Sequence, residues 1–359
     1  MNTYFGLKKN GVSFDAWWEV SYELDGVETI TSENTSEIEV EPIITEESEN
    51  LTAIKLIIKN KCSEDIFLKT AWPVCTDNLS MGEPINKWHI MKQGRHKNDL
   101  PVVCSLSKDD ESFEDAVNVM SETGEYIKDE QDGKIRLVSD QLTLIHTESA
   151  NLAIEYLTAG KCFLSCEFTV SSDFSSAVIS AGCGFQCILP PGCEISTEII
   201  GFDTNKDYIG AIRDFSKSKS ANVIKKAAPA VYSTWYYYGM DITPENIYEN
   251  LTLLTESRLP VTCFQLDDGW EAAYGNWEPN LKFIGGMKKI ADSIIKSGYT
   301  AGIWTCPFTI SQQAPIAAQH PEWMLKSKNG GYCYFHANNR MCYILDLTHP
   351  DVPDYLEKL

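Results

Sequence analysis

Long apolar runs and positive charge are both scarce in this sequence. No stretch approaches the roughly 20 apolar residues that a membrane-spanning helix needs. Lys and Arg number 30 against 51 Asp and Glu, which gives a formal net charge of −21. A chain this acidic argues against nucleic acid and against an anionic membrane as partners. It identifies no partner by itself, because acidic surfaces are common on soluble enzymes.

Leader and cofactor signatures are also missing. Residues 1–20 interleave aromatic and charged side chains and lack the apolar segment of a signal peptide, so we expect a cytoplasmic protein with its 12 cysteines as thiols. The tightest cysteine clusters, Cys162/Cys166 and Cys183/Cys187/Cys193, lack the C-x-x-C pairs of zinc ribbons. Glycine-rich phosphate-binding motifs are absent as well. We therefore expect neither a metal nor a cofactor.

The first part of the chain, to about Gly201, has a strand-like pattern. Turn formers such as Asp25-Gly26 and Pro190-Pro191-Gly192 separate short stretches rich in β-branched and aromatic residues. With no long amphipathic helix between them, these stretches predict a large antiparallel β-sandwich in an N-terminal domain over residues 1–228, with a helical linker near 206–226. The predicted strands are Ala16–Leu24, Glu37–Ile44, Leu51–Lys59, Lys134–Leu144, Asn151–Leu157, Lys161–Val170 and Ser176–Leu189.

Beyond Pro229 the pattern changes to strand, loop, helix. The expected strands are Val231–Tyr237, Val261–Leu266 and Thr300–Thr305, and His349–Leu359 begins a last helix. Two helices between them follow from apolar residues at helical spacing. One starts at Thr243-Pro244 with Ile247, Leu251 and Leu254 on its apolar face, and the other carries Met287, Ile290, Ala291, Ile294 and Ile295 and ends at Gly298. Residues 229–359 are too few for the roughly 250 of a complete (β/α)8 barrel, so they predict its first three βα units.

Two adjacent carboxylates follow the second of these strands. Asp267 and Asp268 stand in F-Q-L-D-D-G-W, directly after an apolar run, and Trp270 and Trp277 come next. Carboxylates accept hydrogen bonds from sugar hydroxyls, and indole faces cover the apolar patches of a sugar ring. The alternative is that one aspartate only caps the turn at Gly269. The pattern favours a sugar site at the carboxyl end of this strand.

Five segments in the second region carry a specific resemblance, which lies in their order and spacing. They read S-T-W-Y-Y-Y, F-Q-L-D-D-G-W, G-N-W-E-P-N, G-I-W-T-C-P-F and L-D-L-T-H-P-D-V, over Ser233–Tyr238, Phe264–Trp270, Gly275–Asn280, Gly302–Phe308 and Leu345–Val352. With them the region resembles the catalytic barrel of the α-galactosidases of glycoside hydrolase family 36, the melibiase-like enzymes. The strand-rich region before it fits the supersandwich-like domain that family members carry ahead of the barrel.

The resemblance implies a retaining exo-glycosidase that removes terminal α-linked galactose from oligosaccharides or glycoconjugates. Asp267 and Asp268 match the paired acids that bind the 4- and 6-hydroxyls of galactose. The remaining substrate-binding candidates are Trp304, Trp235, Arg340 and Trp270. Each has a structural alternative, since a strand-end tryptophan often belongs to the core and an arginine here fits an exposed loop. Asp346 is expected to hold its own loop.

The catalytic residues are a separate expectation. In the family, the nucleophile and the acid/base are aspartates on the fourth and sixth barrel strands, so we expect both beyond Leu359 and none within residues 1–359. Glu271, Glu278 and Glu322 are loop acids without motif support. By this interpretation the chain is truncated within the barrel and inactive alone, and the full-length form is a possible homo-oligomer.

Two alternatives stay open. Cys306, Phe308 and Asn276 stand where many bacterial members of the family have acidic residues, which leaves room for an α-N-acetylgalactosaminidase or a raffinose synthase-like galactosyltransferase. The other alternative is a non-catalytic carbohydrate-binding protein built on the sandwich. Such a binder would not depend on Asp267, whereas the glycosidase site would.

Overall fold

The computed structural model describes residues 2–94, 101–107, 118–120, 126–128, 130–131, 134–205, 207–220, 228–327 and 329–359. The chain divides into two compact units, Met1–Ile224 and Lys225–Leu359. Residues 225–227, in which the predicted domain boundary begins, lie outside the described residues, as do 221–226 of the predicted linker.

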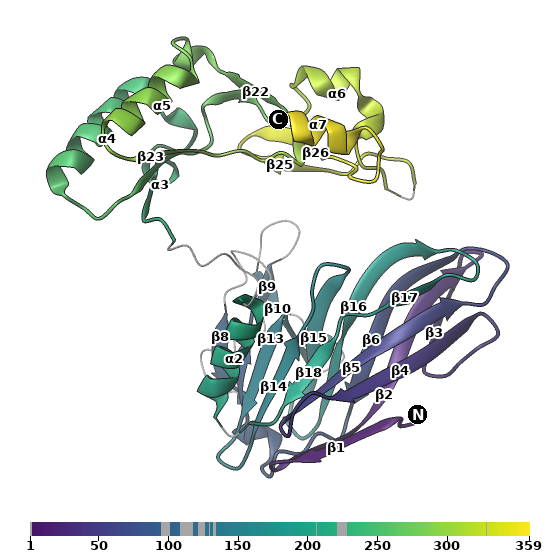
Figure 1. Ribbon diagram of the computed structural model, residues 1–359. Coiled ribbons are helices and arrows are strands. Elements are labelled where there is room, and N and C mark those ends of the chain that lie inside the picture. Colours follow the sequence, from purple (N-terminus) through teal and green to yellow (C-terminus); the bar gives the residue numbers. More distant parts are fainter. Residues whose placement is uncertain are drawn as a thin grey trace. The chain divides into compact units, whose positions relative to one another are not determined.

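The first unit contains two eight-stranded antiparallel sheets (Figure 1). One has the order β1-β2-β6-β16-β15-β12-β11 with β3 beside β2, and the other has the order β17-β5-β18-β14-β13-β7-β8 with β4 beside β5. The first sheet consists of β1 (Phe5–Lys9), β2 (Val12–Leu24), β3 (Val27–Thr31), β6 (Ile66–Thr76), β11 (Glu130–Gln131), β12 (Lys134–Ser139), β15 (Phe163–Ser171) and β16 (Ala177–Leu189). The second consists of β4 (Ile38–Glu46), β5 (Leu51–Asn60), β7 (His89–Lys92), β8 (Val102–Ser105), β13 (Leu142–His146), β14 (Asn151–Tyr156), β17 (Glu194–Ser196) and β18 (Ile200–Asp203).

Smaller elements complete this unit. They are η1 (Ile85–Lys87), the antiparallel pair β9 (Asn118–Met120) and β10 (Tyr126–Lys128), and helix α2 (Tyr208–Ser220). Ala211 of α2 is buried with Leu142, Leu144 and Ala153 of the second sheet, so the helix packs on β13 and β14. The predicted helical character of residues 206–226 is therefore confirmed for 208–220.

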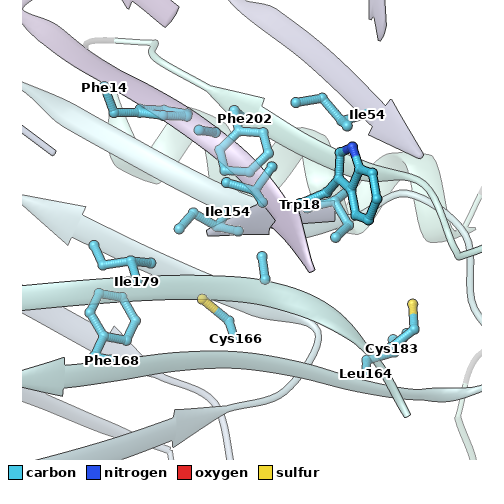
Figure 2. Close-up of a cluster of buried hydrophobic side chains, with 14 of the residues drawn as sticks. Phe14, Trp18, Ile54, Ile154, Leu164, Cys166, Phe168, Ile179, Cys183 and Phe202 are labelled. Carbon is cyan, nitrogen blue, oxygen red and sulfur yellow. The ribbon is translucent and has the colours of Figure 1, made fainter. Parts of the chain in front are cut away.

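The core lies between the two sheets and follows from alternation along the strands. In β2, Phe14, Ala16, Trp18 and Val20 are all buried at every second position. Figure 2 shows Phe14 of one sheet beside Phe202 of the other, and their ring centroids are 5.4 Å apart. Cysteines such as Cys166 and Cys183 fill the same layer as small buried hydrophobes.

One buried hydroxyl also ties the sheets together. The hydroxyl of Tyr156 in β14 donates within 2.6 Å of the Ser165 carbonyl and 2.7 Å of the Gly182 carbonyl, in the opposite sheet. It also accepts the N–H of Gly182 at 2.8 Å. Gly182 lies at a bulge against β6, where a Cβ atom would come within 2.6 Å of the Ala71 carbonyl oxygen. Only glycine allows this close approach of two strands.

The predicted antiparallel sandwich is present, but some of its strands differ from the predicted ones. The stretch Lys134–Leu144 is not one strand, because the chain leaves the first sheet after Ser139 and enters the second at Leu142. The central strand β6 was not predicted. It contains Pro73, which cannot donate to a ladder, and the pairing with β2 skips there from Trp17–Cys75 to Glu19–Trp72.

The second unit is built on a three-stranded parallel sheet, β19 (Val231–Ser233), β20 (Cys263–Leu266) and β23 (Thr300–Ile303), in that order. Helices α4 (Pro244–Ser257) and α5 (Met287–Lys296) connect the strands and pack on them through Ile247, Leu251, Leu254, Ile290 and Ile294. The predicted cap is confirmed, since Thr243 and Asn246 form a capping box. Ile295 is instead 60% exposed and does not belong to the apolar face.

The remaining elements of this unit follow the three parallel strands along the chain. They are α3 (Trp235–Tyr238), η2 (Gly239–Asp241), β21 (Glu271–Ala273), β22 (Asn276–Pro279), η3 (Leu281–Phe283), β24 (Thr309–Ser311), α6 (Pro315–Gln319), η4 (Pro321–Trp323), β25 (Tyr334–Ala337), β26 (Arg340–Ile344) and α7 (Val352–Lys358). The prediction of a strand over Val231–Tyr237 was wrong beyond Ser233, because residues 235–238 turn into a helix. The segment between β23 and the last helix contains the antiparallel sheet β24-β26-β25.

The described residues contain neither a membrane-spanning helix nor a cluster of metal-ligating side chains. None of their helices has both the length and the apolar character to cross a membrane. Nor do their His, Cys, Asp and Glu side chains gather in threes as a metal ion would require.

Candidate functional site

Asp267 follows β20 directly, at the carboxyl end of the parallel sheet. Its Oδ2 accepts hydrogen bonds from Ser233 Oγ and Gln265 Nε2, both at 2.9 Å. Its backbone N–H donates to Thr234 Oγ1 at 3.0 Å. Residues at the ends of β19 and β20 therefore hold this half-buried carboxylate in one orientation.

Asp268 is more deeply buried, with an exposed fraction of 2%. Its Oδ2 accepts hydrogen bonds from the Tyr274 hydroxyl and from Asn338 Nδ2, the latter at 2.8 Å. Its Oδ1 is buried too, and among the described residues this atom has no hydrogen-bond partner. An unpaired buried acceptor is costly, and the Glu271 carboxyl group also lies within hydrogen-bond reach of Asp268.

The surroundings of Asp268 disfavour its charge. Burial raises the pKa of Asp268 to about 6, and the Glu271 carboxylate acts in the same direction. The hydrogen bond from Tyr274 and the charge of Arg340 lower this pKa and offset part of the effect. Strongly shifted carboxylates beside unpaired polar atoms are typical of functional sites.

Arg340 is held by an ion pair inside this cluster. Its Nη1 lies 2.9 Å from Glu271 Oε1, and the exposed side-chain fractions are 14% for Arg340 and 0% for Glu271. The guanidinium also lies over the Tyr274 ring, 4.6 Å from its centroid. Arg340, the first residue of β26, is therefore partly buried and held in an ion pair. The alternative of an exposed charge on a loop is wrong.

Four aromatic rings form a cluster that reaches Asp268 through the Tyr274 hydroxyl. The Tyr274 ring lies 5.6 Å from that of Trp304 and 6.4 Å from that of Trp277, between centroids. Trp270 Nε1 donates to the Trp304 carbonyl at 3.0 Å, and its ring lies 6.2 Å from Trp277. Trp270 is fully buried, whereas Trp304 is half-buried and keeps part of its ring open for contact.

The other candidate residues have different positions. Trp235 lies in α3 and not at a strand end, with 37% of its surface exposed. Its backbone N–H, 3.3 Å from Ser233 Oγ, connects it to the Asp267 network. Asp346 holds its own loop, as expected, by accepting from the backbone and side chain of Thr348, and these bonds lower its pKa.

Three residues of the cluster were not predicted to belong to it. Glu271 is a loop acid without motif support in the sequence, and no sequence motif includes Tyr274 or Asn338 as a site residue. Asn338 had one available signal, because Asn338-Asn339 is a two-residue turn with positive φ values of 48° and 61° between β25 and β26. Asn-Asn is a residue pair that tolerates such a turn. What the turn contacts is not readable from local sequence.

Part of this chain is similar to known alpha-galactosidases. Residues 204–359 match the family model for Melibiase. The chain is 24% identical over 147 residues to probable alpha-galactosidase G of Emericella nidulans, which covers 36% of this chain and 19% of that protein. It is 24% identical over 135 residues to alpha-galactosidase Mel36A of Lactobacillus acidophilus, which covers 35% of this chain and 18% of that protein.

A solved structure matches nearly the whole chain. A variant of the family 36 alpha-galactosidase AgaA from Geobacillus stearothermophilus, in complex with raffinose, superposes with a TM-score of 0.61 and 16% identity over 99% of this chain and 48% of that one. Residues 204–359 are thus similar to Melibiase, and the chain has the fold of family 36 alpha-galactosidases. It spans about half of that structure, and its matches span about a fifth of the two curated relatives.

Proposed function

We propose that this chain carries the galactose-recognition site of an α-galactosidase that removes terminal α-linked galactose from oligosaccharides or glycoconjugates. One observation above all supports it. Asp267 and Asp268 stand together at the carboxyl end of β20, and the second has a buried oxygen for which the described residues provide no hydrogen-bond partner. The Melibiase match over the same residues and the raffinose bound to a structural relative support the choice of sugar.

The recognition chemistry follows from the donors already present. Ser233 and Gln265 fix the Asp267 carboxylate, and a ligand hydroxyl can donate to lone pairs that they leave open. Asp268 Oδ1 offers a second acceptor on the adjacent residue. Galactose presents an axial 4-hydroxyl and a 6-hydroxyl along one edge, which two such acceptors can bind together. The half-buried Trp304 would cover an apolar face of the ring.

The bond-breaking step remains a prediction. A retaining mechanism needs two carboxyl groups about 5–5.5 Å apart, one to form the glycosyl-enzyme and one to protonate the leaving group and then activate water. We expect the family's two aspartates on strands after β23, outside residues 1–359. Glu271 fits neither role in the described cluster, because it is buried and paired with Arg340.

The neighbourhood of Cys306 favours a second candidate function. Burial, with the negative charges of Asp268 and Glu271, raises the pKa of its thiol to about 12, so a neutral thiol stands there instead of an acid. Phe308, two residues on, is 53% exposed. A less acidic, more apolar wall would suit a 2-acetamido group, and the alternative is an α-N-acetylgalactosaminidase.

Turnover assays distinguish these functions. We expect the product of the complete reading frame that contains this sequence to hydrolyse nitrophenyl α-galactoside with net retention. Faster hydrolysis of the N-acetyl analogue would favour the second candidate, and transfer to added raffinose or sucrose in place of water would favour a galactosyltransferase. Carbohydrate binding that persists in Asp267→Ala would favour a sandwich-based binding protein and overturn the proposal.

A further inference from the structure

Tyr274 and Asn338 divide the Asp268 carboxylate into one occupied and one open oxygen. Both residues donate to Oδ2, and Asn338 Nδ2 is also 3.0 Å from the Tyr274 hydroxyl. Oδ1 lies on the other side of the carboxyl group, buried and without a donor from the described part of the chain. The three side chains thus form a closed triangle on the Oδ2 side, and the Glu271 carboxyl group also lies within hydrogen-bond reach of Asp268.

Each member of the triangle is itself fixed. Gly275, next to Tyr274, has a φ of 86°, and a Cβ atom there would lie 2.6 Å from Ile310 Cδ1. The Tyr274 ring is stacked on Trp277 with an interplanar angle of 20° and lies under the Arg340 guanidinium. Asn338 is at the tip of the β25–β26 turn, whose strands are paired from Ala337–Arg340 onward.

Arg340 contributes to this arrangement indirectly. Its Nη1 donates to Glu271 and its guanidinium lies over the Tyr274 ring, so both of these contacts are with other side chains of the cluster. Glu271, Arg340, Tyr274 and Asp268 are linked in this order by three consecutive contacts. It connects a hairpin strand, β21, with the first residue of β26.

We propose that Tyr274 and Asn338 are positioning residues that fix Asp268 so that Oδ1 alone accepts a hydrogen bond from a ligand hydroxyl. This inference rests on the proposed function and deepens it. A site of this kind requires a donor on the sugar. It would reject an analogue in which fluorine replaces the bound hydroxyl, because fluorine retains the size but cannot donate.

Two neighbouring asparagines provide a matched pair of variants. Asn338→Gly removes the amide, and Asn339→Gly removes a side chain that takes no part in the triangle, while glycine suits the positive φ at both positions. Calorimetric titration with methyl α-galactoside should give at least 10-fold weaker binding for Asn338→Gly and unchanged binding for Asn339→Gly. Tyr274→Phe, which keeps the stacked ring, should weaken binding similarly. Equal affinity in Asn338→Gly, Tyr274→Phe and the parent chain would overturn the inference.

A second measurement needs no ligand. The carboxyl ¹³C resonance of Asp268 reports its titration. The titratable groups that interact with it are Glu271, Tyr274, Lys282, Cys306, Arg340 and Cys342. Loss of the donor in Tyr274→Phe or Asn338→Gly should move the titration midpoint to higher pH, and Asn339→Gly should not move it. A midpoint unchanged in all variants overturns the inference even if galactoside binds. If no galactoside binds the parent chain but the midpoint moves, the proposed function fails and the positioning role stands.

Discussion

The ionised Asp268 carboxylate destabilises the folded chain, and the size of this effect on the free energy of unfolding depends on pH. It ionises near pH 6 in the folded chain but near its ordinary pKa of about 4 in the unfolded chain. Between these values the folded state binds the extra proton, so the contribution of this group to stability falls as the pH rises from about 4 to 6. Above pH 6 the full cost is present, up to about 3 kcal/mol.

Asp268→Asn should therefore stabilise the chain at pH 7.5 by roughly 1–3 kcal/mol and not near pH 4. The amide oxygen keeps an acceptor for Tyr274 while the buried charge is removed. Urea unfolding at the two pH values measures the difference. Asp346→Asn is a control of opposite sign, since hydrogen bonds from Thr348 lower the pKa of Asp346 and its stabilisation is present at neutral pH. Destabilisation by Asp268→Asn at pH 7.5 would contradict this account.

Galactoside affinity should decrease as the pH falls through about 6. Protonated Asp268 has a hydroxyl in place of one acceptor, so the ligand loses a partner at the same pH at which folding gains stability. Titrations between pH 5 and 8 test this. The prediction is wrong if affinity is constant over the range, or if it rises as the pH falls.

At the scale of elements, the turn after β20 places both carboxylates. Gly269 has a φ of 107°, and a Cβ atom there would lie 2.8 Å from both the Cα and the carbonyl oxygen of Met240. Asn280 closes the same turn by donating to the Gly269 carbonyl at 2.7 Å. The backbone between Asp268 and Trp270 thus has room for glycine only.

Gly269→Ala should destabilise the chain by about 2 kcal/mol or more and abolish detectable galactoside binding. Thr243→Ala is the matched control in the same unit, because loss of the α4 cap should cost about 1 kcal/mol without moving the carboxylates. Thermal unfolding and calorimetry measure both effects. Normal affinity in Gly269→Ala would show that the turn is not needed for the site.

Local patterns predicted the elements around this turn and missed its long-range partners. The cap at Thr243 and the periodic Ile247, Leu251 and Leu254 are properties of neighbouring residues, and all were found in α4. Asn338 and Asp268 are 70 positions apart, and no periodicity records their contact. The prediction that Trp235 lies in a strand was wrong for a related reason. Aromatic residues favour strands, but the β19 pairing ends at Ser233 and the chain turns into α3.

At the scale of the molecule, a substitution in the core of the first unit should lower stability without changing sugar binding by the second unit. Tyr156 bonds across the sandwich, and Tyr156→Phe would leave the buried Gly182 N–H and two carbonyls without that partner. We expect a loss of about 2–3 kcal/mol in urea unfolding. Galactoside affinity under native conditions should not change. A reduced affinity would favour the sandwich as the binding element.

The overall architecture was predicted better than its details. The strand pattern and the βα pattern each recur several times along the chain. The sandwich and the parallel sheet can therefore be predicted even where the bounds of single strands are wrong. The crossing between sheets after Ser139 and the proline-containing strand β6 are tertiary features that override propensity. Glu271 shows the same limit within the site, since its burial depends on Arg340, which lies 69 positions away.

The most direct test of the account is a calorimetric titration of the chain with methyl α-galactoside and with methyl α-glucoside, which differ only at the 4-hydroxyl. We predict saturable binding of the galactoside, at least 10-fold weaker binding of the glucoside, and loss of galactoside binding in Asp267→Ala. Equal binding of the two sugars, or full galactoside affinity in Asp267→Ala, would contradict a galactose site at Asp267 and Asp268.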